Sequence, residues 1–147
     1  MNQQCPDCGA DLSETESCET FFHQMLFWEN EDPANWRVHH LMVLCYHLQH
    51  PALYSPEGLT HSRQLLKRFI VEGLSPEQVR QQSKKQVASI NRDWKITSTA
   101  DSHGSYDFPV KWRMNAADVV AGGIENYCEN VERWANSIYR TLEGNNG

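Results

Sequence analysis

The chain has no apolar stretch long enough to cross a membrane. Its longest uninterrupted apolar run, residues 41–46, falls far short of the roughly 20 residues that a membrane-spanning helix needs. The first four residues are followed by no apolar core of a signal peptide. We therefore expect a cytoplasmic protein with no membrane partner.

Positive charge is also scarce. The chain has 13 lysines and arginines against 19 acidic residues, a net charge of −6, and no basic stripe. Because proteins bind nucleic acid nonspecifically through a basic face that neutralises phosphates, this composition argues against a nucleic-acid partner. A protein or small-molecule partner is left, and the sequence does not identify it.

The cysteines do not form a paired set. There are five of them, an odd number, which disfavours a disulfide framework in a chain without an export signal. Cys5 and Cys8 stand two residues apart in the motif CPDCGA, where Gly9 lets the backbone turn so that N–H groups face the sulfurs. This is the form of a zinc knuckle, although two cysteines supply only half of a tetrahedral site. A redox pair is the alternative, but no βαβ pattern accompanies it.

Two helices follow the knuckle. Paired apolar residues at helical spacing predict the first helix over residues 18–30. The second is predicted over residues 33–50, about five turns, because Asp32 can cap it, Pro33 suits its first position and Pro51 forbids its continuation. The connection between them is short, so they form an antiparallel pair.

The antiparallel pairing indicates which histidine is the fourth metal ligand. His39 and His50 are eleven residues apart, roughly 16 Å along a helix, and cannot share one ion. The start of the first helix, at Cys18, should lie beside the end of the second, which favours His50, with His47 as the near substitute and His23 as a weaker rival. His39 should instead bond to a buried polar group. The predicted zinc ligands are therefore Cys5, Cys8, Cys18 and His50.

Several of these residues together resemble a known family. The motif CPDCGA, then Cys18, His39, Tyr46 and the triplet at 49–51, QHP, are similar to a bacterial family of uncharacterised proteins, domain of unknown function 5946. Residues 117–119 and 134–137 resemble the family's closing segment. The chain has Leu44 where the family often has an acidic residue, and Glu19 where it has an aromatic one. The resemblance implies no activity.

The second half of the chain predicts further helices separated by a loop. A third helix should span residues 59–72, with Gly73 as its C-cap. Ser75 and Gln78 form a capping box that opens a fourth helix, mostly polar, to about Ile90. The polar run at 93–111 reads as a loop, with His103 and Gly104 in a surface turn that is favoured over the alternative, an approach to a ligand.

The end of the chain predicts the clearest amphipathic helix. Asn115 can cap a last helical region, and Gly122 and Gly123 should break it. From Ile124 to Leu142, apolar residues recur at spacings of three and four. Together these patterns predict an all-α fold: a bundle of four main helices plus short ones. We expect one domain over residues 1–147, with the knuckle, residues 1–17, packed on the bundle by its metal.

Three classes of function fit this sequence. The first is a small binding or accessory protein with a structural zinc, because three thiolates and one imidazole fill the tetrahedron. The second is a metal-dependent enzyme with only three protein ligands, in which His39, His40 or Tyr46 acts as acid or base in an interior pocket. The third is a thiol-based redox sensor that uses Cys5 and Cys8. The sequence does not decide whether the protein is an enzyme.

Overall fold

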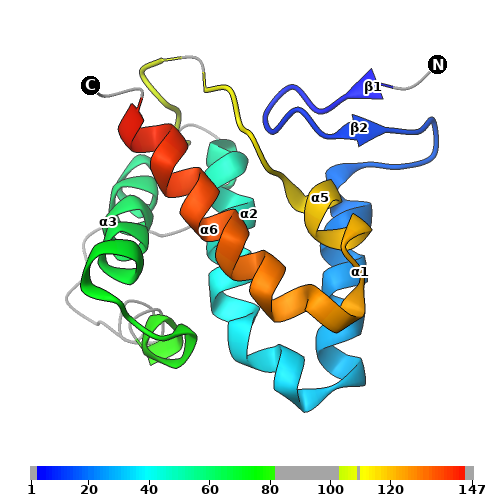
Figure 1. Cartoon of the computed structure of the whole chain (residues 1–147). Coiled ribbons are helices and arrows are strands. Elements are labelled where there is room, and N and C mark those ends of the chain that lie inside the picture. The colour runs from blue at the N-terminus through cyan, green and yellow to red at the C-terminus, as the bar shows by residue number, and fades with distance from the viewer. Residues whose placement is uncertain (1–2, 82–102, 109, 145–147) are drawn as a thin grey trace.

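A computed structural model describes residues 3–81, 103–108 and 110–144 of the chain (Figure 1). The fold is an α-helical bundle with one small two-stranded sheet at its N-terminal end, which confirms the predicted fold class. In chain order the elements are β1 (Gln3–Gln4), β2 (Asp11–Leu12), α1 (Cys18–Glu31), η1 (Pro33–Val38), α2 (His39–Gln49), η2 (Pro51–Leu53), α3 (Pro56–Glu72), α5 (Ala116–Ala121), η3 (Ile124–Asn126) and α6 (Tyr127–Gly144), where η marks a 3-10 helix.

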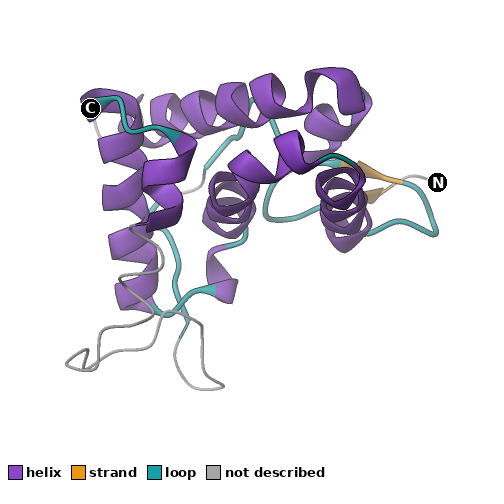
Figure 2. Ribbon diagram, turned by 90° about the horizontal axis from the view of Figure 1, so that it is seen from below, coloured by secondary structure: helices purple, strands orange, loops and turns teal. Residues whose placement is uncertain are grey.

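Helix α2 lies in the middle of the bundle. Helix α6 crosses it, with α3 on one side and α1 on the other (Figure 1). Seen from below, α1 and α2 appear nearly end-on along the same side of α6, and the sheet lies at the α1 end (Figure 2). The core residues at these contacts are fully buried and include Met25, Leu41, Leu48, Trp134 and Ile138. Among the described helices, none combines the length and apolar character needed to cross a bilayer.

The segment predicted as one helix from residue 33 to residue 50 consists of two elements, so that prediction is wrong in its first turns. Asp32 does cap the segment, accepting from the Ala34 N–H at 3.0 Å, and Pro33 is at its first position. However, residues 33–38 form the 3-10 helix η1. In a 3-10 helix, side chains three residues apart eclipse each other, and the Trp36 indole stacks on the His39 ring at 4.3 Å between centroids. The α-helix begins only at His39.

The predicted helix ends in the middle of the chain are confirmed where the structure describes them. Gly73 ends α3 in the left-handed conformation, with φ +73°. Ser75 and Gln78 form their capping box, with side chain to backbone bonds of 2.8 and 3.2 Å, and residues 76–81 are helical. The rest of that predicted helix, to Ile90, lies outside the described residues. Helix α3 starts three residues earlier than predicted because the Ser55 hydroxyl caps it, accepting from the Gly58 N–H at 3.0 Å.

The break before the last helix is also confirmed. Asn115 caps α5, accepting from the Ala117 N–H at 3.0 Å, and α5 ends at Gly122. Gly123 has φ +85°, a conformation that favours glycine. A Cβ on Gly122 would lie 2.2 Å from Nδ2 of Asn130. The chain can therefore turn here and bring α6 back across α2.

The described part of the predicted loop packs onto the bundle. His103 is exposed, as expected of a surface turn, but Gly104 is buried and donates its N–H to the Tyr54 carbonyl at 2.7 Å. The Tyr106 hydroxyl donates to the carbonyl of Leu48. The Trp112 indole N–H reaches across to the knuckle and donates to the Asp7 carbonyl at 2.9 Å. These bonds bring the segment that precedes α5 beside the N-terminal sheet.

Candidate metal centre

The knuckle is a tight turn between the two strands. β1 and β2 pair antiparallel, with Gln4 opposite Asp11. Inside this pair, the Cys5 N–H donates to the Ala10 carbonyl and the Gly9 N–H to the Cys5 carbonyl, both at 2.9 Å. Gly9 has φ +78°, so the turn favours glycine at this position. The Ala10 N–H bonds to the Cys8 sulfur. The turn therefore points two buried sulfurs in one direction, as the motif predicts.

His50 is placed by the way in which α2 ends. Pro51 has no N–H, so it cannot donate to the His47 carbonyl as the next helical residue would. The His50 N–H takes that role at 3.0 Å. The Tyr46 carbonyl, which a regular helix would bond to the His50 N–H, instead accepts from Nδ1 of the His50 ring at 2.7 Å. This bond orients the ring and directs Nε2 toward the knuckle.

Cys18 comes from the first turn of α1. At the N-cap, the Thr20 hydroxyl accepts from the Ser17 N–H at 3.1 Å, and the Thr20 N–H donates to the Ser17 carbonyl at 3.0 Å. Because α1 and α2 run antiparallel, the start of α1 lies beside the end of α2 (Figure 1). The Cys18 sulfur therefore meets the knuckle sulfurs and the His50 ring, as the short connection between these helices predicts.

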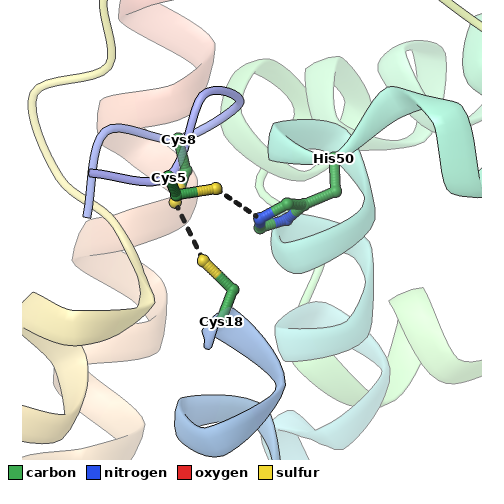
Figure 3. A group of neighbouring side chains, drawn as sticks. All are labelled: Cys5, Cys8, Cys18 and His50. Carbon is green, nitrogen blue, oxygen red and sulfur yellow. Dashed lines mark hydrogen bonds between the residues drawn. The ribbon is translucent and has the colours of Figure 1, made fainter. Parts of the chain in front are cut away.

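The four donor atoms form a compact group (Figure 3). Nε2 of His50 lies 3.6 Å from Sγ of Cys5, and the Cys8 and Cys18 sulfurs are 3.5 Å apart. All four donor atoms lie within 4.8 Å of one another, and all four residues are buried. Zinc–sulfur and zinc–nitrogen bonds arranged tetrahedrally would give sulfur–sulfur edges of about 3.8 Å and sulfur–nitrogen edges of about 3.6 Å. The spacing and chemistry of this set fit a tetrahedral ion.

The pKa values of the cluster indicate which protons a metal ion would displace. The hydrogen bond from the Cys18 thiol lowers the pKa of Cys8 to about 4, although burial opposes this. The same contact, together with burial, raises the pKa of Cys18. Burial alone would lower the pKa of His50, but its bonds to the Cys8 thiolate and to the Tyr46 carbonyl raise it to about 9. At neutral pH a metal would therefore displace protons from His50 and Cys18.

The alternative histidines lie outside this group. His23 is exposed on α1. The His47 ring packs edge-on against Tyr54 at 4.8 Å, and burial, helped by the charge of His50, lowers the pKa of His47 to about 4. The fully buried Cys45 and the half-buried Cys128 are also outside the cluster. Among the described residues, only Cys5, Cys8, Cys18 and His50 form such a group of donors.

His39 has the buried polar partner that its position predicts. Its Nδ1 lies 2.7 Å from Oε1 of Glu29, and the Tyr127 hydroxyl donates to Oε2 of the same carboxylate at 2.5 Å. Burial, followed by the Glu29 charge, raises the pKa of Tyr127. We did not expect a functional role for Glu29 from the sequence. The spacing in the sequence could have identified it, because Glu29 continues the buried stripe of α1 that contains Phe21 and Met25.

An open hollow adjoins the knuckle. It has a volume of about 490 Å³ and is lined by residues 4–9 on one side and by Val110, Lys111 and Trp112 on the other. Both knuckle cysteines contribute to its wall. Four protein donors would nevertheless occupy all four coordination positions of a tetrahedral ion and leave none for water or a substrate. The arrangement is therefore better suited to a structural metal ion than to a catalytic one.

The fold and the site together define a class: an all-α bundle with a buried group of three cysteines and one histidine that could hold a metal ion. A family model matches residues 3–143, nearly the whole chain. The protein belongs to the family of unknown function DUF5946, as its knuckle and QHP motifs predict. Neither the comparison with curated proteins nor that with solved structures found a match.

Proposed function

We propose that this protein is a small binding or accessory protein that holds one structural zinc ion through Cys5, Cys8, Cys18 and His50. The observation that supports this is the convergence of four buried donors, from three separate segments, within 4.8 Å. Zinc is the proposed metal because thiolates with an imidazole in tetrahedral spacing suit it best. The reduced thiols suit the cytoplasm, where glutathione and thioredoxin keep them so.

The role of the ion follows from how little else holds the N-terminal segment. Among residues 3–17, only Cys5, Cys8 and Ala10 are buried. Burying one alanine contributes little, on the order of 1 kcal/mol. Structural zinc contributes roughly 10 to 16 kcal/mol of apparent binding energy in zinc-finger peptides. The proposed zinc therefore holds the knuckle against the ends of α1 and α2.

Metal analysis of the protein purified without chelator tests the proposal. We expect about one zinc per chain, and X-ray absorption at the zinc edge should fit three sulfurs and one nitrogen. The Cys8→Ser variant should lose zinc. Cys128→Ser is the matched control, because Cys128 is half-buried and outside the cluster. A protein without zinc, or a Cys8→Ser variant that keeps it, would overturn the proposal.

The same experiments separate the alternative functions. An enzyme needs an open coordination position, so absorption spectra that fit three protein ligands and a water oxygen would favour it. A redox sensor would release zinc when peroxide oxidises two thiolates to a disulfide and is itself reduced to water, and a thiol reductant would restore binding. We expect neither result.

A further inference from the structure

Three arginines gather around one hollow on the surface of α6. Arg133 and Arg140 come from α6, and Arg113 comes from the segment that precedes α5. With Asn136 and Ser137 they line a space of about 350 Å³. On a helix, residues 133, 136, 137 and 140 share one face over two turns, about 10 Å along the axis. None of these five residues belongs to the metal cluster or lines the hollow at the knuckle.

These three arginines lack a direct carboxylate partner in the described part of the chain. No described carboxylate forms an ion pair with Arg113, Arg133 or Arg140, although the protein has 19 acidic residues and a net charge of −6. Of the other described arginines, two pair with carboxylates, Arg37 with Glu132 at 3.7 Å and Arg68 with Glu72 at 3.3 Å, and Arg63 lies over the Tyr106 ring instead. Three like charges around one hollow repel one another, and a bound anion would remove that cost.

We propose that this hollow binds the phosphate group of a small phosphorylated molecule. A guanidinium matches two phosphate oxygens at once with a planar pair of N–H donors. One arginine is enough for a single carboxylate, whereas a phosphate ester has two negative charges and three terminal oxygens and can engage three arginines. The Ser137 hydroxyl and the Asn136 side chain, whose Nδ2 donates to the Glu132 carbonyl at 2.9 Å, add neutral polar groups.

The size of the hollow indicates what is attached to the phosphate. Its 350 Å³ is at the lower end of the range for small-molecule sites, about 300 to 1,000 Å³. This exceeds the space that one inorganic phosphate needs, so an organic group or a second phosphate also fits. A nucleic-acid strand would need positive charge that continues along its backbone. Here the positive charge is confined to one hollow, which favours a small molecule.

Titration calorimetry of the zinc-loaded protein with pyrophosphate and inorganic phosphate, at constant low ionic strength, tests the proposal. We expect saturable binding of one pyrophosphate per chain. The variants Arg113→Gln, Arg133→Gln and Arg140→Gln should each weaken it by about tenfold, the loss expected for one charge-assisted contact. Arg80→Gln is the matched control, since it removes the same charge from an exposed position on another helix. It should weaken binding by less than about twofold.

Several results would overturn the proposal. One is the absence of saturable pyrophosphate binding, and another is an equal loss of affinity in the Arg80→Gln control, which would show a general charge effect. Citrate binding as tightly as pyrophosphate would contradict the choice of phosphate. A single-stranded RNA oligomer that binds the same arginines more tightly than pyrophosphate would assign the hollow to a polymer. Melting temperatures of all variants, expected to match the wild type, show that each one is folded.

Discussion

Replacing His39 with alanine tests whether one buried carboxylate connects three helices. Glu29 of α1 has a side chain with no exposed surface, and it accepts hydrogen bonds from His39 of α2 and from Tyr127 of α6. In the alanine variant, one oxygen of this buried carboxylate loses its donor. Among the described residues, the Tyr127 hydroxyl is then the one hydrogen-bond donor left to the Glu29 carboxylate.

The magnitude follows from the burial of the two partners. Hydrogen bonds to charged groups contribute about 1.5 to 3 kcal/mol, and breaking a fully buried charged pair costs about 3 to 5 kcal/mol. The His39 side chain is 19% exposed, so water can enter the space that it leaves, and Tyr127 keeps its bond. We therefore expect a loss of about 2 to 3 kcal/mol, which lowers the melting temperature by roughly 5 to 10 °C in a chain of this size.

Zinc content should distinguish the His39→Ala variant from a His50→Ala variant. His39 is outside the donor group, so His39→Ala should keep about one zinc per chain, while His50→Ala should lose most of it. Thermal unfolding and elemental analysis of both variants give the answer, with the exposed His23→Ala as the control. If His39→Ala loses zinc and His50→Ala keeps it, the ligand assignment is wrong. If His39→Ala has the same melting temperature as the control variant, the contact between His39 and Glu29 contributes no stability.

Three other predictions follow from the same geometry. Cys8→Ser should let a protease cut residues 3–17 faster than wild type while the helices stay intact, and unchanged cleavage would count against a metal-held knuckle. Zinc affinity should rise with pH through the neutral range and less steeply above about 9, because up to that pH the raised pKa of His50 keeps a proton on the ring that zinc must displace. Calorimetry in buffers of different ionisation enthalpy should find at least two protons released at neutral pH, from His50 and Cys18. Gly123→Ala should cost about 1 to 3 kcal/mol in chemical unfolding, because φ is +85° there, and a neutral effect would refute this reasoning.

The grouping of Cys5, Cys8, Cys18 and His50 in space could be predicted from the sequence, while their role as zinc ligands stays a prediction. Only local facts were needed: a Cys-x-x-Cys turn, a two-proline boundary around the second helix, and a connection too short for anything but an antiparallel pair. Each of these depends on residues close together in the chain, whose geometry is fixed by backbone sterics. The structure brings Cys18 and His50 together for these reasons.

The features that the sequence did not predict depend on contacts between distant segments. The buried Glu29 meets Tyr127 of α6, 98 residues later. The arginine hollow is lined by Arg113 and Arg133 from opposite sides of the turn at Gly123 in the sequence, so these charges form no continuous basic stripe along the chain. The buried carboxylate and the arginine hollow therefore appear only when the helices are assembled. The 3-10 start of the second helix is a local feature, and the capping pattern at Asp32 and Pro33 does not distinguish a 3-10 turn from an α-helical one.

The segment between the loop and α5 connects the two proposed sites. Trp112 donates its indole N–H to the knuckle at Asp7, and the next residue, Arg113, lines the arginine hollow. One residue further on, the Met114 carbonyl accepts from the Gln49 side chain of α2 at 2.6 Å. The backbone that presents Arg113 is therefore held on one side by the knuckle and on the other by the end of α2. Since the proposed zinc joins these same two elements, the phosphate titration is done on the zinc-loaded protein, where Arg113 has both of its supports.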